Sequence, residues 1–337
     1  MNRKTAAALL ITIVLLFFIF YKIDVSILIE TFRTFKCNNL LVITFLYLFS
    51  LLLRGVRWKF ILNNDARYSI VKLAEIFTVG SLMNVFIPAR AGDLYRAYYL
   101  GEIKNEKKMK ILGSVILERI FDGIAVFVML LIAVINYCRQ DWIVRLSGFV
   151  GLLFVGSLIV AYILIKSDRI TPFFSDVSRL SSKLPAAVSK RVDNILNLLK
   201  GYILSLIEGL DVLNNVFMTF SALIVSGIIW GIEFVIAILI LKYGFSLQIS
   251  LSVGLFIIAL TSFSTMIPST SVFLGPYQYA YILALGIYGV SKSAALAIAT
   301  VHQGLLTLIL LVVGGLIVVK NNLKRVFYRK TDLISDD

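Results

Sequence analysis

The sequence is poor in the residues that carry much enzyme chemistry and most cross-links. Only one histidine and two cysteines occur among 337 residues. A His-ligated metal site is therefore not expected, and two cysteines are too few for a disulfide scaffold or a metal cluster. Charged residues make up 15% of the chain, hydrophobic residues make up 59%, and the mean hydropathy is +0.93. Because ordinary soluble domains are about 45–50% apolar, this composition excludes a water-soluble enzyme.

The chain instead gathers its apolar residues into blocks of about twenty, the length that crosses a ~30 Å hydrocarbon core as a helix. This pattern predicts an all-α, polytopic membrane protein. The first block follows Arg3 and Lys4 and has no small-residue cleavage site after it, so we expect a retained span rather than a signal peptide. Six full spans are expected, at residues 5–21, 40–53, 111–135, 146–165, 212–241 and 293–319.

Two further apolar stretches, residues 73–100 and 249–287, contain helix-breaking residues. Proline and glycine open the backbone, which must then face protein or water and never lipid. We interpret both stretches as re-entrant helix pairs; the alternative is two full spans, which would give eight crossings. The breaks are formed by Asn84, Pro88 and Gly92 in the first pair and by Pro268, Gly275 and Pro276 in the second.

The distribution of basic residues predicts the orientation, because short loops rich in Lys and Arg stay in the cytoplasm. With the N-terminus inside, the inner segments hold 25 of the 33 basic residues, and Arg119 alone lies within a span. Both termini are then cytoplasmic in the cell membrane, and the two helix pairs enter from opposite faces. Such an arrangement is typical of inverted-repeat transporters. The net charge of +14 is explained by orientation and anionic lipid, so nucleic acid is not an expected partner.

The chain forms a single integral membrane domain over residues 1–337, with a cytoplasmic tail at 320–337 and one long hydrophilic piece, residues 166–211. Within that piece, apolar residues from Val188 to Leu210 recur every three or four positions, which predicts an amphipathic helix on the cytoplasmic leaflet. It has neither a glycine-rich phosphate loop nor a nucleophile with its base. On the outer side, Cys37 and Cys138 could form a disulfide, but two free thiols are favoured.

Charged side chains inside the predicted spans are informative because each costs roughly 2.5–3.5 kcal/mol near the membrane centre. The richest cluster is Glu118, Arg119 and Asp122 in the third span. Glu118 and Asp122 share a helical face, and Arg119 precedes Asp122 by three residues, so an ion pair within the helix would lower the cost. The cluster either lines a polar cavity that meets a charged headgroup or forms a buried network that only fixes helix packing.

Two arginines follow the break in the first helix pair, Arg90 and Arg96. A guanidinium matches phosphate oxygens with two parallel hydrogen bonds, and exposed N–H groups at a helix terminus add to that. The pair therefore suits the phosphodiester of a lipid. The alternative is anchoring at the cytoplasmic surface, which would explain Arg96 better than Arg90.

Other polar side chains are weaker candidates. Glu233 lies near the middle of the fifth span with no basic neighbour on its own helix, so it is either protonated or paired from another helix. His302, in the sixth span, is more readily a satisfied polar side chain than a proton relay. The sequence does not decide whether Arg54, Arg57 and Trp58, at the end of the second span, are interfacial anchors or part of a site.

Taken together, these residues resemble the transmembrane flippase-like domain of lysylphosphatidylglycerol synthetases and its free-standing relatives, over nearly the whole chain. The resemblance rests on the order and spacing of several short motifs. They are Arg54-Gly-Val-Arg57-Trp58, then Gly80 with Asn84, Pro88, Arg90, Gly92, Asp93 and Arg96, then Glu118-Arg119-Ile-Phe-Asp122, Trp230 with Glu233, and Pro268 with Gly275.

The resemblance implies that the domain moves an aminoacylated phospholipid from the inner to the outer leaflet, while a separate soluble domain attaches the amino acid. Because this chain stops at Asp337, we expect translocation without synthesis. The resemblance also implies an inner cavity that faces Glu233 and the second helix pair. The residues it places in that cavity are Arg90, Asp93, Arg96, Glu118, Arg119 and Asp122.

The sequence departs from the family pattern in the second hairpin and in the final span. Ser271, Val272 and Phe273 stand where relatives carry Pro-Gly-Gly in the hairpin, and Gln278 stands where they carry an acidic residue soon after it. His302 stands about where relatives carry Arg in the final span. The missing acidic group weakens the case for a cationic lysyl headgroup in particular.

We therefore expect a flippase or transporter of an anionic or aminoacyl-modified phospholipid or a polyprenyl-linked lipid, without a cofactor and without enzymatic activity. The alternative is a scaffold subunit that docks a glycosyltransferase or lipid synthetase through the helix in 166–211. An integral membrane enzyme is less favoured, although Glu118, Asp122 and Glu233 could do acid–base work.

Overall fold

A computed structural model describes residues 24–87, 90–136, 140–167, 170–181, 186–265 and 275–332. Throughout these ranges all regular structure is helical, which confirms the predicted all-α class. The α-helices are α2 (Val25–Thr34), α3 (Leu40–Ile61), α4 (Ile70–Phe86), α5 (Ala91–Lys104), α6 (Lys108–Asn136), α7 (Asp141–Lys166), α8 (Ile170–Ser181), α9 (Ala186–Glu208), α10 (Val216–Ile238), α11 (Leu251–Ser264), α12 (Pro276–Gly286) and α13 (Lys292–Asp332). Short 3-10 turns at Cys37–Asn39 and Asp211–Asn214 precede α3 and α10, and a π-helical turn, Leu239–Gly244, follows α10.

Within the described ranges, four helical stretches are long and apolar enough to cross a membrane. They are Cys37–Ile61, Asp141–Lys166, Val216–Gly244 and Lys292–Asn321. They match predicted spans and support a multi-pass membrane protein. The predicted span 111–135 corresponds to α6, whose 29 residues include three charged side chains near its middle. The predicted span 5–21 lies outside the described residues.

Helix α3 continues about two helical turns beyond residue 53, the predicted end of the second span, and ends at Ile61. The prediction stopped at Arg54 because a charge was taken to mark the membrane surface. In the structure, Arg57 and Trp58 are completely buried by other helices, so the chain has no reason to leave the helix at that point.

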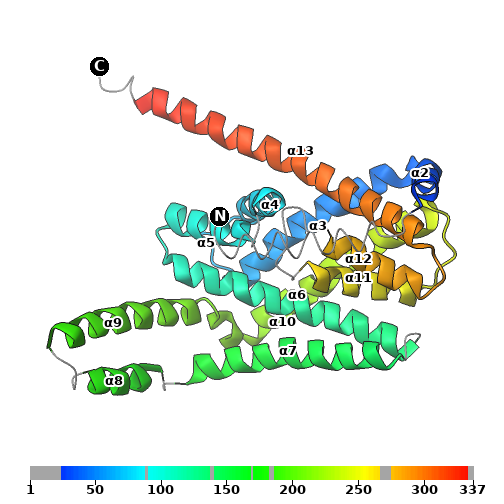
Figure 1. Ribbon diagram of the computed structural model, residues 1–337. Helices are drawn as coiled ribbons and strands as arrows, with labels where there is room; N and C mark the ends of the chain where they lie inside the picture. The colour runs from blue at the N-terminus through cyan, green and yellow to red at the C-terminus, as the bar shows by residue number, and fades with distance from the viewer. Residues whose placement is uncertain are drawn as a thin grey trace.

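Helix α6 is the centre of the bundle (Figure 1). It packs against α5, α7, α9, α10 and α11. Helix α3 lies between α10 and α4, while α13 packs along α2, α4 and α12 and then extends beyond the bundle toward the C-terminus. Every polar residue on the inner face of α6 is therefore surrounded by protein on several sides.

Both predicted helix pairs are present as pairs of short helices. Helices α4 and α5 contain 17 and 14 residues, and α11 and α12 contain 14 and 11. The members of each pair pack against each other. All four are shorter than the ~20 residues of a simple span, which favours re-entry, although their depth in the membrane stays a prediction. Pro88 and Pro268 lie outside the described residues.

The first helix pair closes through two glycines. A Cβ atom added to Gly92 would lie 1.8 Å from the carbonyl oxygen of Gly80, so only glycine allows this crossing of α4 and α5. The amide N–H of Gly92 donates to Oδ1 of Asn84 over 2.7 Å. Asn84 and Gly92, predicted as break residues, thus hold the start of α5 against the end of α4.

The hydrophilic piece predicted to carry one amphipathic helix contains two, α8 and α9. They pack against each other, and Asp193 on α9 accepts hydrogen bonds from the hydroxyls of Ser181 and Ser178 over 2.6 and 2.8 Å. These two donors lower the pKa of Asp193 because they stabilise its charged form. Helix α9 also crosses α6 closely, since a Cβ on Gly113 of α6 would lie 2.1 Å from the Leu206 carbonyl oxygen. Its position on the cytoplasmic leaflet stays a prediction.

The buried apolar residues form two clusters with polar side chains between them. One cluster includes Ile43 of α3 and Leu130 of α6, and the other includes Trp58 of α3 and Leu117 of α6. The charged residues of α3, α6 and α10 occupy the segments between the clusters. Away from this core, Cys37 is exposed and forms no disulfide within the described residues, and Cys138 lies outside them.

Candidate functional site

Four helices send charged side chains toward the junction between the two apolar clusters. Spacings of three or four residues place Arg54 with Arg57, Asp93 with Arg96, and Glu118 with Asp122 on one face of their helices. Helix α3 contributes Arg54 and Arg57, α5 contributes Asp93 and Arg96, α6 contributes Glu118, Arg119 and Asp122, and α10 contributes Glu233.

Glu118 is the centre of a buried network, which we define as Arg57, Asp93, Arg96, Glu118, Arg119 and Asp122. The two Nη atoms of Arg96 donate to the two carboxylate oxygens of Glu118 over 3.0 and 2.7 Å. Nη2 of Arg57 lies 3.2 Å from the same carboxylate, and Arg57 also donates to Asp122. With three arginines and three carboxylates, the network is electrically neutral, which lowers the cost of burying each charge.

Arg119 belongs to the network but also reaches beyond it. Its Nη2 and Nε donate to the carboxylate of Asp93 over 2.8 and 3.2 Å, whereas its distance to Asp122 on the same helix is 3.5 Å. The predicted pairing within the helix is thus the weaker of the two contacts, because a bond to α5 allows a bidentate geometry. Glu118 lies 3.9 Å from Arg119 and pairs mainly with Arg96 and Arg57.

Aromatic rings enclose the guanidinium of Arg96. Its central carbon lies 4.3 Å from the ring centroid of Trp58 and 4.5 Å from that of Phe77. Trp58 is itself held by a hydrogen bond from its Nε1 to the Ser114 hydroxyl over 3.0 Å. Arg57 and Arg96 each keep an Nε without a partner. Trp58 and Arg57 are therefore internal residues, and the alternative that they anchor the chain at the membrane surface is wrong.

Glu233 is partnered from another helix, one of the two states that the sequence left open. Its Oε1 accepts hydrogen bonds from Nη2 of Arg54 over 3.0 Å and from the hydroxyl of Ser50 over 3.1 Å. Both donors come from α3, so this ion pair fastens α3 to α10 beside the buried network.

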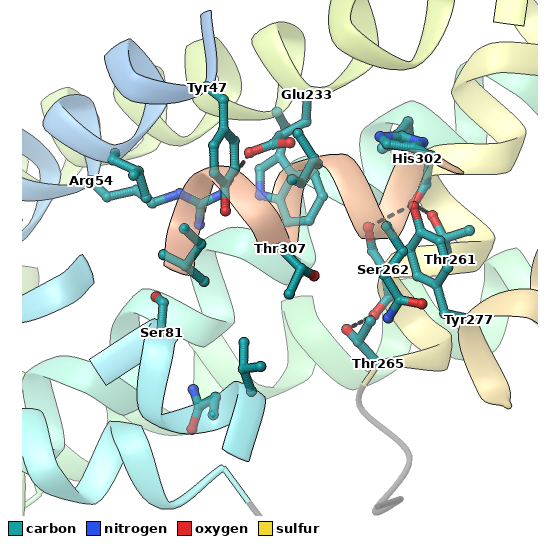
Figure 2. A pocket seen from close by; sticks show the side chains of 18 of the residues that line it. Tyr47, Arg54, Ser81, Glu233, Thr261, Ser262, Thr265, Tyr277, His302 and Thr307 are labelled. Atoms are coloured by element: carbon teal, nitrogen blue, oxygen red, sulfur yellow. Dashed lines mark hydrogen bonds and ion pairs between the residues drawn. The ribbon is translucent and has the colours of Figure 1, made fainter. Parts of the chain in front are cut away.

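A cavity of about 300 Å³ opens next to this ion pair and separates it from α11, α12 and α13. Figure 2 shows Arg54, Tyr47 and Glu233 on one side, with Tyr277, His302 and the hydroxyl residues of α11 on the other. The charged residues on its wall are Arg54, Arg90, Arg119 and Glu233. Aromatic walls come from Tyr47, Phe77, Trp230 and Tyr277, and polar groups come from Ser81, Asn84, Thr261, Ser262, Thr265, His302, Gln303 and Thr307.

Arg90 joins the two helix pairs at the cavity. It is the N-cap residue of α5 and has φ = 55°, a left-handed conformation that costs a non-glycine residue energy. Its Nη2 donates to the carbonyl oxygen and hydroxyl of Thr265, at the end of α11, over 3.0 and 3.4 Å. The backbone strain is thus associated with a guanidinium placed between the two breaks.

In the second helix pair, the residue before α12 also has a positive φ. Gly275 has φ = 98°, and its N–H donates to Oε1 of Gln278 over 2.8 Å, so Gln278 caps the helix that Pro276 starts. The amide nitrogen of Gln278 donates to Oε1 of Gln303 over 2.6 Å. Next to it, Nδ1 of His302 is hydrogen-bonded to the hydroxyl of Tyr281. Gln278 therefore stabilises the break instead of supplying a charge.

Comparison with known proteins agrees with this architecture. The family model described as lysylphosphatidylglycerol synthase TM region matches residues 5–314. The chain belongs to this family. A UPF0104 membrane protein of Methanocaldococcus jannaschii is 24% identical to it over 226 residues, which cover 66% of this chain and 86% of that protein. No solved structure matches the chain significantly.

In this member of the lysylphosphatidylglycerol synthase TM-region family, the predicted site residues divide into two groups. The first group lines the cavity: Arg54, Asn84, Arg90, Arg119, Glu233 and His302. The second group is packed around the wall or at helix starts: Arg57, Trp58, Gly92, Asp93, Arg96, Glu118, Asp122, Gly275, Pro276 and Gln278.

Sequence reasoning missed several residues of the cavity wall, of which Tyr47, Ser81 and Thr307 are examples. Each is an uncharged polar residue in a mostly apolar helix, and nothing distinguishes it in sequence from one that faces lipid. The end of α11 did carry a signal, because four of the five residues from Thr261 to Thr265 bear hydroxyls. Such a run in an apolar helix indicates a face turned toward protein or water.

Proposed function

We propose that this protein moves a phosphate-bearing lipid between the two leaflets of the membrane. The observation that carries the proposal is the cavity at the meeting point of the two helix pairs, whose wall contains three arginines and one glutamate. A guanidinium is well suited to phosphate because it donates two parallel hydrogen bonds and stays charged. Membership of the lysylphosphatidylglycerol synthase TM-region family supports a role in lipid handling.

In the proposed mechanism, the phosphate meets Arg90 first. The start of α5 adds backbone N–H groups and the positive end of the helix dipole, both of which favour an anion. The headgroup then crosses the polar wall between α5 and α11 while the acyl chains stay in lipid. The buried network holds α3, α5, α6 and α10 in place during this passage, and of its members only Arg119 also lines the cavity.

We also propose that both termini face the cytoplasm of a cell membrane, as the basic residues favour. The lipid is then supplied on the inner leaflet by a separate soluble synthetase or glycosyltransferase, and this protein translocates it. The one carboxylate among the described residues of the cavity wall, Glu233, is bound by Arg54, so it is not poised as a general base.

Reconstitution tests the proposal. Purified protein in vesicles should accelerate the movement of a fluorescent anionic phospholipid from one leaflet to the other, measured by dithionite quenching against protein-free vesicles. A polyprenyl-phosphate lipid and a zwitterionic phospholipid provide the comparison. Equal rates with and without protein for every lipid would show that the proposed transport is wrong.

A further inference from the structure

The charges on the cavity wall are unequal in number and in availability. Three guanidiniums face one carboxylate among the described wall residues. The nearby carboxylates of Asp93, Glu118 and Asp122 are turned to arginines of the buried network and do not line the cavity. Arg119 on the wall is itself paired with Asp93 of that network. Counted over the wall and the network together, five arginines and four carboxylates among the described residues leave an excess of one positive charge near a ligand in the cavity.

The single carboxylate is also occupied. Glu233 accepts from Arg54 and Ser50 through the same oxygen, and the Arg54 guanidinium stays 3.0 Å from it. The other oxygen, Oε2, has no hydrogen-bond partner among the described residues, but the charge of the carboxylate is already balanced by Arg54. An ammonium group at Oε2 would lie close to this guanidinium, and like charges placed together oppose binding. The wall therefore offers a phosphate several donors, whereas the carboxylate that it offers an ammonium is already balanced by a guanidinium.

The rest of the wall combines flat aromatic rings with hydroxyl groups. Tyr47 and Tyr277 stand on opposite sides of the cavity (Figure 2), and Trp230 is held in place by a hydrogen bond from its Nε1 to Asp122 over 2.8 Å. The hydroxyls of Ser81 and Thr307 have no hydrogen-bond partner among the described residues. A ring whose faces are C–H and whose rim is hydroxyl fits both features, because the faces pack on aromatic rings and the rim bonds to polar groups.

We propose that the cavity selects an anionic lipid whose headgroup is an uncharged polyol ring, such as a hexose or inositol joined to phosphate, and rejects a headgroup that carries an ammonium. This inference rests on the proposed function, because it names the class of lipid that the same site would move. The volume of about 300 Å³ suits one ring with its phosphate, since it lies at the lower end of ~300–1,000 Å³ for small-molecule sites.

Binding of short-chain lipids to the full-length protein in detergent tests the selectivity directly. The probes are dioctanoyl phosphatidylinositol, phosphatidylglycerol, phosphatidic acid and lysyl-phosphatidylglycerol, with affinity measured from the shift in melting temperature. We expect phosphatidylinositol to bind best and lysyl-phosphatidylglycerol to bind roughly tenfold more weakly than phosphatidylglycerol, the effect of about one misplaced charge. Equal or tighter binding of the lysyl lipid would overturn the inference, and so would phosphatidylinositol that binds no better than phosphatidic acid.

A pair of variants tests the role of Arg54. Arg54→Gln leaves the Glu233 carboxylate without its guanidinium, so this variant should gain affinity for lysyl-phosphatidylglycerol, again roughly tenfold. The double variant Arg54→Gln with Glu233→Gln removes both charges at the same position and should show no such gain. A gain in both variants, or in neither when Arg54→Gln folds, would contradict the assignment of Glu233 as the occupied acceptor.

The two proposals can fail separately. Selective binding without accelerated lipid movement in vesicles would refute transport and leave the selectivity standing. Accelerated movement with a preference for the lysyl lipid would refute the selectivity and leave transport standing.

Discussion

The buried network and the cavity wall are built from the same residue types, yet their surroundings differ. In the network, Arg57 and Arg96 have side chains 0% and 1% exposed and are matched by the α6 carboxylates, Glu118 for both and Asp122 for Arg57. On the cavity wall, arginines outnumber carboxylates, and the side chain of Arg119, which also belongs to the network through Asp93, is 29% exposed. We therefore propose that an arginine inside this protein supports the fold where packing covers it completely, and meets a ligand where its side chain stays partly exposed to the cavity.

The largest expected effect concerns the network. Glu118→Gln leaves Arg57 and Arg96 buried without their shared carboxylate, and breaking such a pair costs about 3–5 kcal/mol. We expect a strongly reduced melting temperature in detergent and a low yield of folded protein, measured by size-exclusion chromatography.

Glu208→Gln is the matched control. Glu208 pairs with Lys107 over 2.9 Å, but the two side chains are 46% and 61% exposed. Surface pairs of this kind contribute about 0–1 kcal/mol, so the melting temperature should hardly change. If Glu118→Gln were as stable as Glu208→Gln, the buried network would contribute no more to stability than an exposed ion pair, and this prediction would be wrong.

An intermediate loss of stability is expected at the contact between α4 and α5, which positions residues of both the buried network and the cavity wall. Helix α5 carries Arg96 into the network and Arg90 to the cavity, and its start is set by Gly92 against Gly80. Gly92→Ala would push a methyl group into a backbone oxygen, which cannot move aside as a side chain does. We expect a loss of about 3 kcal/mol, the upper part of the overpacking range.

The control for that substitution is Gly156→Ala on α7, where an added Cβ meets nothing within 4 Å. Alanine favours a helix over glycine, so this variant should be as stable as the parent or slightly more stable. Thermal unfolding of the two variants side by side decides the point. A stable Gly92→Ala protein would show that the crossing of α4 and α5 can relax.

Substitution of Arg90 is expected to have the smallest effect on stability. Its effect on transport is expected to be large. Arg90→Gly removes the guanidinium and also suits the left-handed backbone, so the free energy of unfolding should change by less than about 1 kcal/mol. Transport in vesicles should fall at least roughly tenfold, whereas Arg90→Lys should recover only part of it, because an ammonium is a point charge.

Asn105→Gly serves as the control, because Asn105 is also left-handed, with φ = 52°, and ends α5 away from the cavity. Transport and stability should both be retained. Normal transport by Arg90→Gly would show that Arg90 does not bind the lipid. A loss of stability equal to that of Glu118→Gln would show that Arg90 supports the fold instead.

Local sequence patterns predicted the helices well where the signal was repeated along the chain. Blocks of about twenty apolar residues located α3, α6, α7, α10 and α13, and helix-breaking residues located the turns between α4 and α5 and between α11 and α12. The end of α3 was misjudged because a single arginine has the same appearance in sequence at a membrane surface and in a buried pair. Helix α2 was also missed, because its ten residues are much shorter than the apolar blocks of about twenty that predicted the other helices.

The sequence by itself determined that this is an all-α, multi-pass membrane protein with charged residues at costly positions, because hydropathy and helix breaks act over neighbouring residues. Only the tertiary structure decided what each charge does. Glu118 meets Arg96 across 22 positions of sequence, and Glu233 meets Arg54 across 179. Whether a charge is neutralised by a partner or faces a cavity depends on which helices pack together. No single segment of the sequence reveals this, because the interaction energy arises between segments that are distant in the chain.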